Sequence, residues 1–134
     1  MKELTEKIIG AAIEVHKTIG PGLLESAYEE CLAHEMRIRG VSFERQVSLP
    51  VAYKGVTLDC GYRLDFLVER AVVLELKALG ALQPIHEAQL LTYLGLGGWT
   101  VGLLINFNVP VLRDGIKRVV LNYKDVSAPS APLR

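Results

Sequence analysis

The chain has 134 residues, of which 15 are basic and 15 acidic, so its formal net charge is zero, and half of its residues are hydrophobic. This length predicts one domain that buries a core of its own, and the apolar fraction excludes a disordered chain. The neutral charge argues against DNA binding by the whole surface, leaves room for a local basic patch, and favours self-association.

Neither a membrane span nor an export signal is expected. Apolar runs such as residues 99–105, WTVGLLI, are too short to cross a bilayer, and the N-terminal residues MKELTEKIIG lack the core of a signal peptide. We therefore expect a cytoplasmic protein. Cys31 and Cys60 have no Cys or His at metal-ligand spacing, so both are expected to be free, buried thiols.

Two helices are expected at the start of the chain. An apolar stripe predicts a helix from about Leu4 to Thr18, and Gly-Pro-Gly at residues 20–22 ends it. A second helix is expected from about Leu23 to Arg39, with Gly40 as its end.

The pattern then changes to strands. Alternation with a proline predicts an edge strand over residues 43–53, KG at residues 54–55 makes a turn, and a second strand with a bulge at Gly61 is expected over residues 56–69. The remaining expected elements are a strand at 71–79, a helix at 84–96 opened by Pro84 and closed by Gly97 and Gly98, an apolar interior strand at 100–107, and a last strand or short terminal element at 115–123.

This order of elements implies an α/β fold in which helices flank a mixed sheet. One domain is expected over residues 1–126, followed by a flexible C-terminal tail at 127–134 that contains Pro, Ser and Ala. The expected edge strands, with FERQVSLPV at 43–51 and KRVVLNY at 117–123, could pair between copies, so a homo-oligomer is expected.

Three charged residues stand among apolar neighbours on the two central strands. Glu75 and Lys77 share one face of a strand that is expected to be covered on both sides. If this strand forms a hairpin with the preceding one around residues 70–71, Asp65 comes close to Glu75. Two buried carboxylates repel each other, and a hard cation such as Mg²⁺ between them would remove the conflict. Lys77 could then orient the attacking water or stabilise charge on a phosphate, and a structural ion pair of Lys77 with either carboxylate is the alternative.

Polar residues on two helices could add to this group. His86, Gln89 and Tyr93 fall on one face of the helix after the strand, and Glu25 and Tyr28 lie one turn apart on the second helix. The simpler interpretation is a helix cap with a half-buried tyrosine in the former, and a first-turn acid favoured by the helix dipole at Glu25.

Several separate motifs occur in the order of a known family. The run GLLESAY at residues 22–28 fits the pattern Gly-x-x-Glu-x-x-Tyr, and YRLDFLV, VLELKAL, HEAQLLTYL and GLLINFN follow it. Over nearly its whole length the chain resembles the small bacterial GxxExxY proteins of the PD-(D/E)XK nuclease superfamily. The resemblance implies a restriction-endonuclease-like core of a helix, three strands, a helix and a strand.

The resemblance also implies roles for residues on the strands. Asp65 and Glu75 would bind Mg²⁺ or Mn²⁺, joined by the backbone carbonyl of Leu76, and Lys77 would assist the attacking water. The sequence departs from the superfamily pattern at one position, where Leu64 replaces the proline that precedes the first acid.

Residues on the helices have implied roles as well. Glu25 would be the extra acid that many superfamily members supply from the first core helix. Gln89 and Tyr93 match the Gln-x-x-x-Tyr motif of RecB-like nucleases, where it supports the metal site and DNA. His16 and His86 recur in the family signature without an assigned role.

These observations lead to the hypothesis of a Mg²⁺-dependent nuclease that hydrolyses phosphodiester bonds of DNA or RNA. Arg45, Lys54 and Arg63 lie on the strands that lead to the site and either touch phosphates or form a solvated edge. The rival hypothesis is a non-catalytic, self-assembling protein that retains the nuclease fold, and a nucleic-acid binder that does not cut lies between the two.

Overall fold

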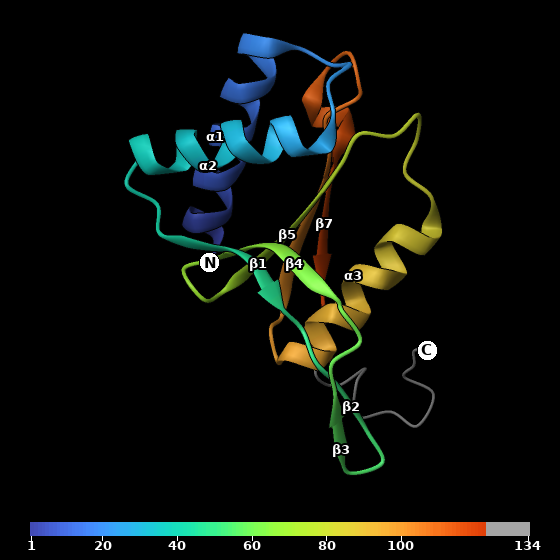
Figure 1. The fold of residues 1–134 in the computed structure, drawn as a ribbon. Coiled ribbons are helices and arrows are strands. Elements are labelled where there is room, and N and C mark those ends of the chain that lie inside the picture. Colours follow the sequence, from blue (N-terminus) through green and yellow to red (C-terminus); the bar gives the residue numbers. More distant parts are fainter. Residues whose placement is uncertain (123–134) are drawn as a thin grey trace.

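The computed structural model describes residues 1–122, so the predicted tail at 127–134 lies outside the described residues. Five strands form a sheet in the order β1-β4-β5-β6-β7, and β2 and β3 form a separate two-stranded hairpin (Figure 1). Within the five-stranded sheet β5 and β6 are parallel, while the other neighbouring strands are antiparallel. This arrangement confirms the predicted α/β fold with a mixed sheet flanked by helices.

The elements are, in chain order, α1 (Lys2–Ile19), α2 (Glu25–Ile38), β1 (Phe43–Ser48), β2 (Val51–Tyr53), β3 (Val56–Leu58), β4 (Arg63–Val68), β5 (Val72–Lys77), α3 (Pro84–Gly97), β6 (Val101–Asn106), the short 3₁₀ helix η1 (Leu112–Gly115) and β7 (Ile116–Val120). The helix α3 makes the crossover that two parallel strands require, here from β5 to β6. The strands predicted at 71–79 and 100–107 are therefore neighbours in the centre of the sheet.

The ends of the first two helices follow from glycine. Gly20 has a φ of 72° and Gly40 a φ of 73°, in the left-handed region that glycine adopts without the strain of a side chain. The helices predicted from the apolar stripes are confirmed, and each differs from its predicted bounds by only one or two residues at either end.

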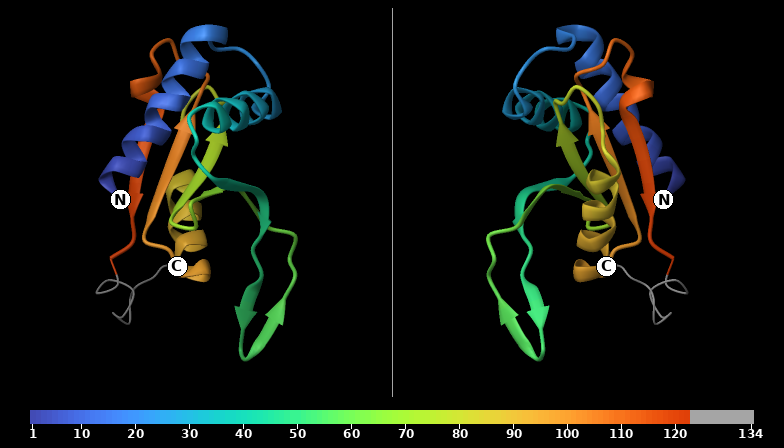
Figure 2. Two further views of the ribbon diagram at one scale, coloured as in Figure 1. Left: turned by 90° about the vertical axis from the view of Figure 1, so that its left-hand side faces the viewer. Right: turned by 90° about the vertical axis from the view of Figure 1, so that its right-hand side faces the viewer.

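The core has one layer on each face of the sheet. Val72, Leu74 and Leu76 of β5 pack with buried residues of α1 and α2, whereas Val73 packs on the other face with Leu90 of α3 and its neighbours. Figure 2 shows α1 and α2 on one side of the sheet and α3 on the other. Because β5 is covered on both faces, as the sequence predicts, polar side chains on it are placed inside the protein.

Two predicted strands are each broken into two. The strand expected at 43–53 stops before Pro50, which has no backbone N–H to donate, and the strand expected at 56–69 is interrupted around Gly61, whose φ is 79°. Between the breaks, the Leu49 N–H donates to the Tyr62 carbonyl at 2.9 Å. The sequence β2–turn–β3 therefore leaves the sheet as a hairpin arm, residues 51–58, that projects from the body of the molecule (Figure 2).

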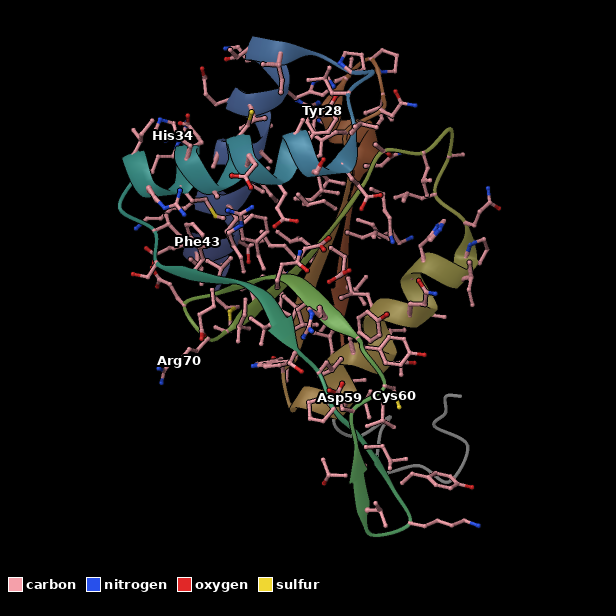
Figure 3. All side chains as sticks on the ribbon, viewed as in Figure 1. Tyr28, His34, Phe43, Asp59, Cys60 and Arg70 are labelled. Atoms are coloured by element: carbon pink, nitrogen blue, oxygen red, sulfur yellow. The ribbon has the colours of Figure 1, made fainter. Side chains whose placement is uncertain are left out.

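The cysteines are free, as the sequence predicts, but the prediction that they are buried is wrong. Cys31 is half-buried, and Cys60 is exposed beside Asp59, where the arm returns to the sheet (Figure 3). Among residues 1–122, no helix is both long and apolar enough to cross a membrane.

Candidate active site

Asp65 and Glu75 lie opposite each other where β4 and β5 separate. The last paired residues of these strands are Phe66 and Leu74, one step before the two acids. The connecting turn has Glu69 and Arg70 at positive φ of 49° and 56°, so it lies one residue earlier than the turn expected at 70–71. This register brings the two acids together on one face of the sheet, at the point where the pairing of β4 and β5 ends.

Each carboxylate is held by the backbone of the opposite strand. The Asp65 N–H donates to Oε2 of Glu75 at 3.1 Å, and the Leu76 N–H donates to Oδ2 of Asp65 at 2.8 Å. Side-chain oxygens thus take the place of the carbonyls that would continue the ladder between the strands. Both side chains are fixed in position without a direct hydrogen bond between the two carboxylates.

Burial makes ionisation of this pair costly. Glu75 is 8% exposed, and burial raises its pKa from 4.5 to about 8, with a further contribution from the charge of Asp65. Burial raises the pKa of Asp65 as well; the hydrogen bond from Leu76 opposes this rise, and the charges of Glu29 and Glu25 increase it. Near neutral pH the pair therefore retains a proton unless a cation balances its charge.

Lys77 lies on the same strand face as Glu75, two residues further along. It is half-buried, and its charge lowers the pKa of Asp65 and of Glu75. Lys77 forms no ion pair with either acid among the ion pairs of residues 1–122. The ammonium is thus close enough to act electrostatically on the pair and remains available for another anion.

The helix α2 presents two acids to the pair. Glu25, in the first turn, is exposed, and its charge raises the pKa of both Asp65 and Glu75. Glu29 lies one turn further and raises the pKa of Asp65. Sequence reasoning missed Glu29, although its spacing of four residues from Glu25 places both on one helical face.

Residues of β1 hold Glu29 in place. Nη2 of Arg45 lies 2.9 Å from Oε2 of Glu29 and 2.6 Å from Oε2 of Glu30, and Nε2 of Gln46 donates to Oε1 of Glu29 at 3.0 Å. The backbone of Gln46, which lies between the paired residues Arg45 and Val47 of β1, has a φ of 51°. Arg45, which the sequence offers as a phosphate contact, is therefore occupied by two carboxylates.

Tyr28, the tyrosine of the Gly-x-x-Glu-x-x-Tyr run, is buried at the start of α2 (Figure 3). Its hydroxyl donates to the Gly20 carbonyl at 2.6 Å and accepts from the Leu23 N–H at 3.2 Å. Its ring stacks on that of Phe107, with centroids 4.4 Å apart. Tyr28 thus fixes the loop between the helices, and with it the first turn of α2 that carries Glu25.

The helix α3 contributes Tyr93 to the neighbourhood of the pair. Tyr93 is half-buried, and its pKa is raised by burial and then by the charges of Glu75, Tyr62 and Asp65. Gln89, expected beside it, is exposed, and none of the hydrogen bonds found within residues 1–122 joins it to the two acids.

The two histidines of the family signature have structural contacts. His86 caps α3, where its Nδ1 accepts from the Gln83 N–H at 2.8 Å. His16 is buried beside Phe107, with Nε2 2.8 Å from the Val109 carbonyl. His86 therefore acts as a helix cap, the simpler of the two interpretations, and His16 joins α1 to the segment after β6.

Another buried polar residue, Asn106, was missed by sequence reasoning. It pairs with Lys77 in the register, its Oδ1 accepts from the Leu79 N–H at 2.9 Å, and its Nδ2 donates to the Leu79 carbonyl at 3.1 Å. Asn106 therefore holds the chain that leaves β5 directly after Lys77. An asparagine at the end of an otherwise apolar strand is the signal that could have identified it.

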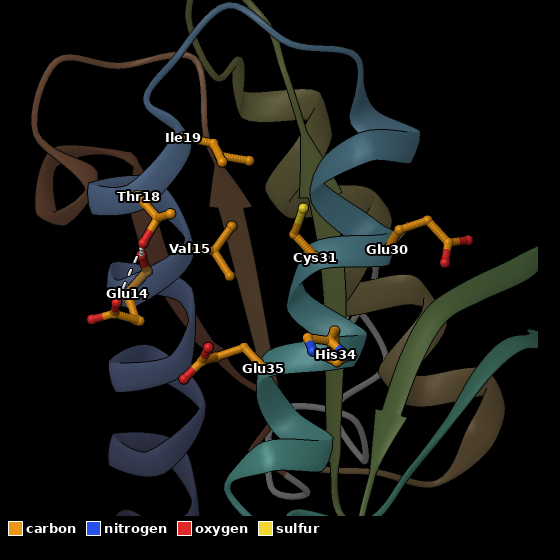
Figure 4. A pocket seen from close by; sticks show the side chains of 8 residues that line it. All are labelled: Glu14, Val15, Thr18, Ile19, Glu30, Cys31, His34 and Glu35. Carbon is orange, nitrogen blue, oxygen red and sulfur yellow. Dashed lines mark hydrogen bonds between the residues drawn. The ribbon is translucent and has the colours of Figure 1, made fainter.

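A hollow lies away from these acids, between α1 and α2, with a volume of about 320 Å³. Figure 4 shows the side chains that line it, among them Glu14 and Glu35, with Cys31 and Val15 on its floor. None of its lining residues belongs to β4, β5 or α3, so this hollow is separate from the carboxylate pair.

The donor atoms at the pair suit a hard divalent cation only in part. Within residues 1–122, no three His, Cys, Asp or Glu side chains are grouped closely enough to hold a metal ion. Two carboxylates are nevertheless a common protein contribution to Mg²⁺, which keeps several waters and takes further oxygens from substrate phosphates. The repulsion between Asp65 and Glu75 is the physical reason to expect a cation there.

A mixed five-stranded sheet flanked by helices, with two acids and a lysine at the separation of its antiparallel strands, defines a restriction-endonuclease-like fold. Residues 2–119 match the family model of the PD-(D/E)XK nuclease superfamily. Since the match covers most of the chain, this chain belongs to that superfamily. No curated protein gives a significant match. Membership of the GxxExxY branch stays a prediction.

Proposed function

We propose that the chain is a nuclease that uses a divalent cation, Mg²⁺ or Mn²⁺, to hydrolyse phosphodiester bonds of nucleic acid. The observation that carries this proposal is the buried, mutually repelling pair of Asp65 and Glu75 beside the ammonium of Lys77, which forms no ion pair within residues 1–122. A purely structural pair of acids would cost stability, because burial opposes their charge more strongly than the two backbone hydrogen bonds favour it.

The side chains have distinct parts in this proposal. Asp65 and Glu75, with the backbone carbonyl of Leu76, would hold the cation, and Glu25 would add an outer acid from α2. A cation bound there supplies Lewis-acid polarisation of the phosphate and a lowered pKa of the attacking water. Lys77 orients that water and stabilises negative charge that develops on the phosphate.

The residues of α3 complete the site in the proposal. Tyr93, whose pKa is raised by the charge of Glu75, would support the metal site from the α3 side. Gln89 would contact the nucleic acid from the exposed face of the helix. Cytoplasmic location stays a prediction of the sequence.

The test is cleavage by the purified protein with Mn²⁺ on single-stranded, duplex and branched DNA and on RNA. Lys77→Ala should lower the rate by about a hundredfold or more while the fold remains intact by circular dichroism. Lys7→Ala, which removes an exposed lysine of α1, is the matched control and should cut like the wild type. A wild type that is inert on all four substrates would refute the proposal.

The second candidate is a non-catalytic, self-assembling protein that keeps the nuclease fold. It is favoured by large apolar side chains that are exposed, such as Leu24 at 76% and Val120 at 55%, on a chain without net charge. Under this alternative, assembly would survive Asp65→Asn and Lys77→Ala unchanged, and no substrate would be cut.

A further inference from the structure

The hairpin arm, residues 51–58, carries an apolar face that nothing in residues 1–122 covers. Val51 pairs with Leu58 and Tyr53 with Val56, and paired residues point to the same side, so these four side chains share one face. Tyr53, Val56 and Leu58 are 58%, 54% and 41% exposed. The opposite face has only Ala52 and Thr57.

This face does little for the stability of the fold. A two-stranded hairpin without further strands or a helix against it is marginally stable in water. The arm is nevertheless well formed, with a two-residue turn at Lys54 and Gly55 whose φ values are 49° and 81°. Side chains that are apolar, clustered and exposed on a projecting element are available for contact with another molecule.

The arm is directly connected to the candidate active site. The chain that returns from it passes through Tyr62, whose ring centroid lies 5.9 Å from that of Tyr93, and reaches Asp65 three residues later. Tyr62 is itself 46% exposed. Aromatic rings are thus found on the arm, at its base and beside the two acids.

Residues 51–63 carry two basic side chains and one acidic side chain, so the net charge of this region is positive. Nζ of Lys54 lies 5.4 Å from the centre of the Tyr53 ring at the tip, and Arg63 is exposed at the base. Neither forms an ion pair within residues 1–122. The one acid, Asp59, accepts a hydrogen bond from the Gly61 N–H. The active site, by contrast, is rich in acids, so without a bound cation it offers a polyanion only the charge of Lys77.

We propose that the arm binds an unpaired strand of nucleic acid and directs it to Asp65 and Glu75. Bases stack on the apolar face around Tyr53 and Val56, while Lys54 and Arg63 contact phosphates. The part of this inference that leads the nucleic acid to Asp65 and Glu75 rests on the proposed nuclease function. The binding of the nucleic acid is inferred from the geometry of the arm alone.

An unpaired strand fits this surface better than a duplex. Stacking on an aromatic residue needs the flat face of a base, which is open in a single strand and covered in a duplex. Duplex binding draws on many phosphate contacts, and the arm with its base offers two free cations. The contact is therefore mainly apolar, with a weak dependence on salt.

A second copy of the arm fits less well. In a two-fold antiparallel pairing, the tip of one arm lies at the base of the other, so Lys54 of one copy approaches Arg63 of its partner. Like charges at both ends oppose such a pairing, whereas both attract a phosphate backbone.

Fluorescence anisotropy in EDTA tests binding without cleavage, with a labelled DNA strand of about 20 nucleotides and the blunt duplex of the same sequence. Tyr53→Ala and Val56→Ser should each weaken binding of the single strand, by about tenfold for Tyr53→Ala. Tyr53→Phe keeps the ring and should bind like the wild type. Val111→Ser is the matched control, since Val111 is 56% exposed in the segment between β6 and η1.

Further readouts come from the same samples. A plot of log affinity against log salt should have a slope of about −1.4, as two phosphate contacts on a single strand predict. Equal binding by Tyr53→Ala and wild type, or tighter binding of the duplex, would overturn the proposal. So would a fall in molar mass of Tyr53→Ala by light scattering, because it would show that the arm binds a second copy.

The outcomes separate this inference from the proposed function. Arm-dependent strand binding by a protein that never cuts would leave the inference standing and refute the nuclease. Cleavage that is unaffected by Tyr53→Ala and Val56→Ser, with unchanged binding, would leave the nuclease standing and refute the role of the arm.

Discussion

Asp65 and Glu75 are locked to each other's strands, since the Asp65 N–H donates to Glu75 and the carboxylate of Asp65 accepts from the Leu76 N–H. At this point the two side chains replace the backbone pairing of β4 and β5. Their carboxylate oxygens are held at fixed positions where they could bind a cation. Because the negative charge there is buried, the stability of the site depends on pH and on a bound cation.

The first prediction concerns pH. The pKa of Glu75 is about 8 in the folded chain against an ordinary value of 4.5, so between these limits the folded state binds more protons than the unfolded state. Its contribution to stability is complete below about pH 4.5 and is lost as the pH rises to about 8. Without metal, the melting temperature should fall by about 10 °C or more across this window.

Glu75→Gln provides the control for this titration, because the amide keeps an oxygen that can accept from the Asp65 N–H and carries no charge. Scanning calorimetry of this variant should show a much shallower fall over the same range. Equal slopes for the wild type and Glu75→Gln would mean that Glu75 ionises normally.

The second prediction concerns the cation. Mg²⁺ or Mn²⁺ binds the folded state alone, so at a hundred times the dissociation constant it should add about 2.7 kcal/mol to the free energy of unfolding. Binding must displace the proton that the pair retains, so affinity should increase as the pH rises toward about 8. Calorimetric titration at several pH values measures both effects.

Asp65→Asn should abolish the metal-dependent stabilisation, because it removes one of the two charges that attract the cation. Asp114→Asn, which changes an exposed aspartate of η1, should leave it intact. Equal binding by Asp65→Asn and the wild type would place the metal elsewhere.

The third prediction concerns Tyr28. Tyr28→Phe removes the hydroxyl that joins the Gly20 carbonyl to the Leu23 N–H, and retains the ring that stacks on Phe107. The loss of two hydrogen bonds at a buried position should cost about 1–3 kcal/mol in urea unfolding. Tyr53→Phe, at an exposed tyrosine with no hydroxyl contact among the described hydrogen bonds, should cost nothing measurable. A Tyr28→Phe variant as stable as the wild type would show that the loop is held by other contacts.

Much of the fold follows from patterns of a few residues. The alternation along residues 71–79 and the short turn before it were sufficient to predict that Asp65 approaches Glu75. Glu29 was missed because its relation to Asp65 depends on how α2 packs across the sheet, which no local pattern specifies. Gln46 was missed for a similar reason, since its positive φ and its hydrogen bond to Glu29 of α2 are not visible in the alternating pattern of β1.

The hairpin arm was not predicted, although the sequence shows the proline and the glycine that delimit it. The sequence predicts Pro50 as a sign of an edge strand and Gly61 as a bulge, each within a continuous strand. The structure makes each a complete break, because the two interruptions face each other across the hydrogen bond from Leu49 to Tyr62. That the two interruptions lie side by side depends on how the strands pair in the fold, and the sequence of one strand does not show it.

The last prediction is that the chain forms a homo-oligomer through the β7 edge of the sheet. The edges are β1 and β7, as the sequence predicts. The left-handed backbone of Gln46 interrupts β1, which makes that edge a poor template for pairing, whereas no residue of β7 has a positive φ. Lys117 of β7 is paired with Glu87 at 3.4 Å, and Val120 is 55% exposed.

Light scattering after size exclusion, at micromolar concentration and over a hundredfold dilution, measures the assembly. Two β7 edges can pair antiparallel about a two-fold axis, which closes a dimer. Val120→Glu adds a charge to that edge and should shift the protein to the monomer, because charged side chains on an edge strand oppose its pairing with another copy. Val111→Glu adds the same charge at a similar exposure outside the edge and should leave the mass unchanged. A wild type that stays at the monomer mass of 14.8 kDa throughout would exclude this interface and weaken the assembly alternative.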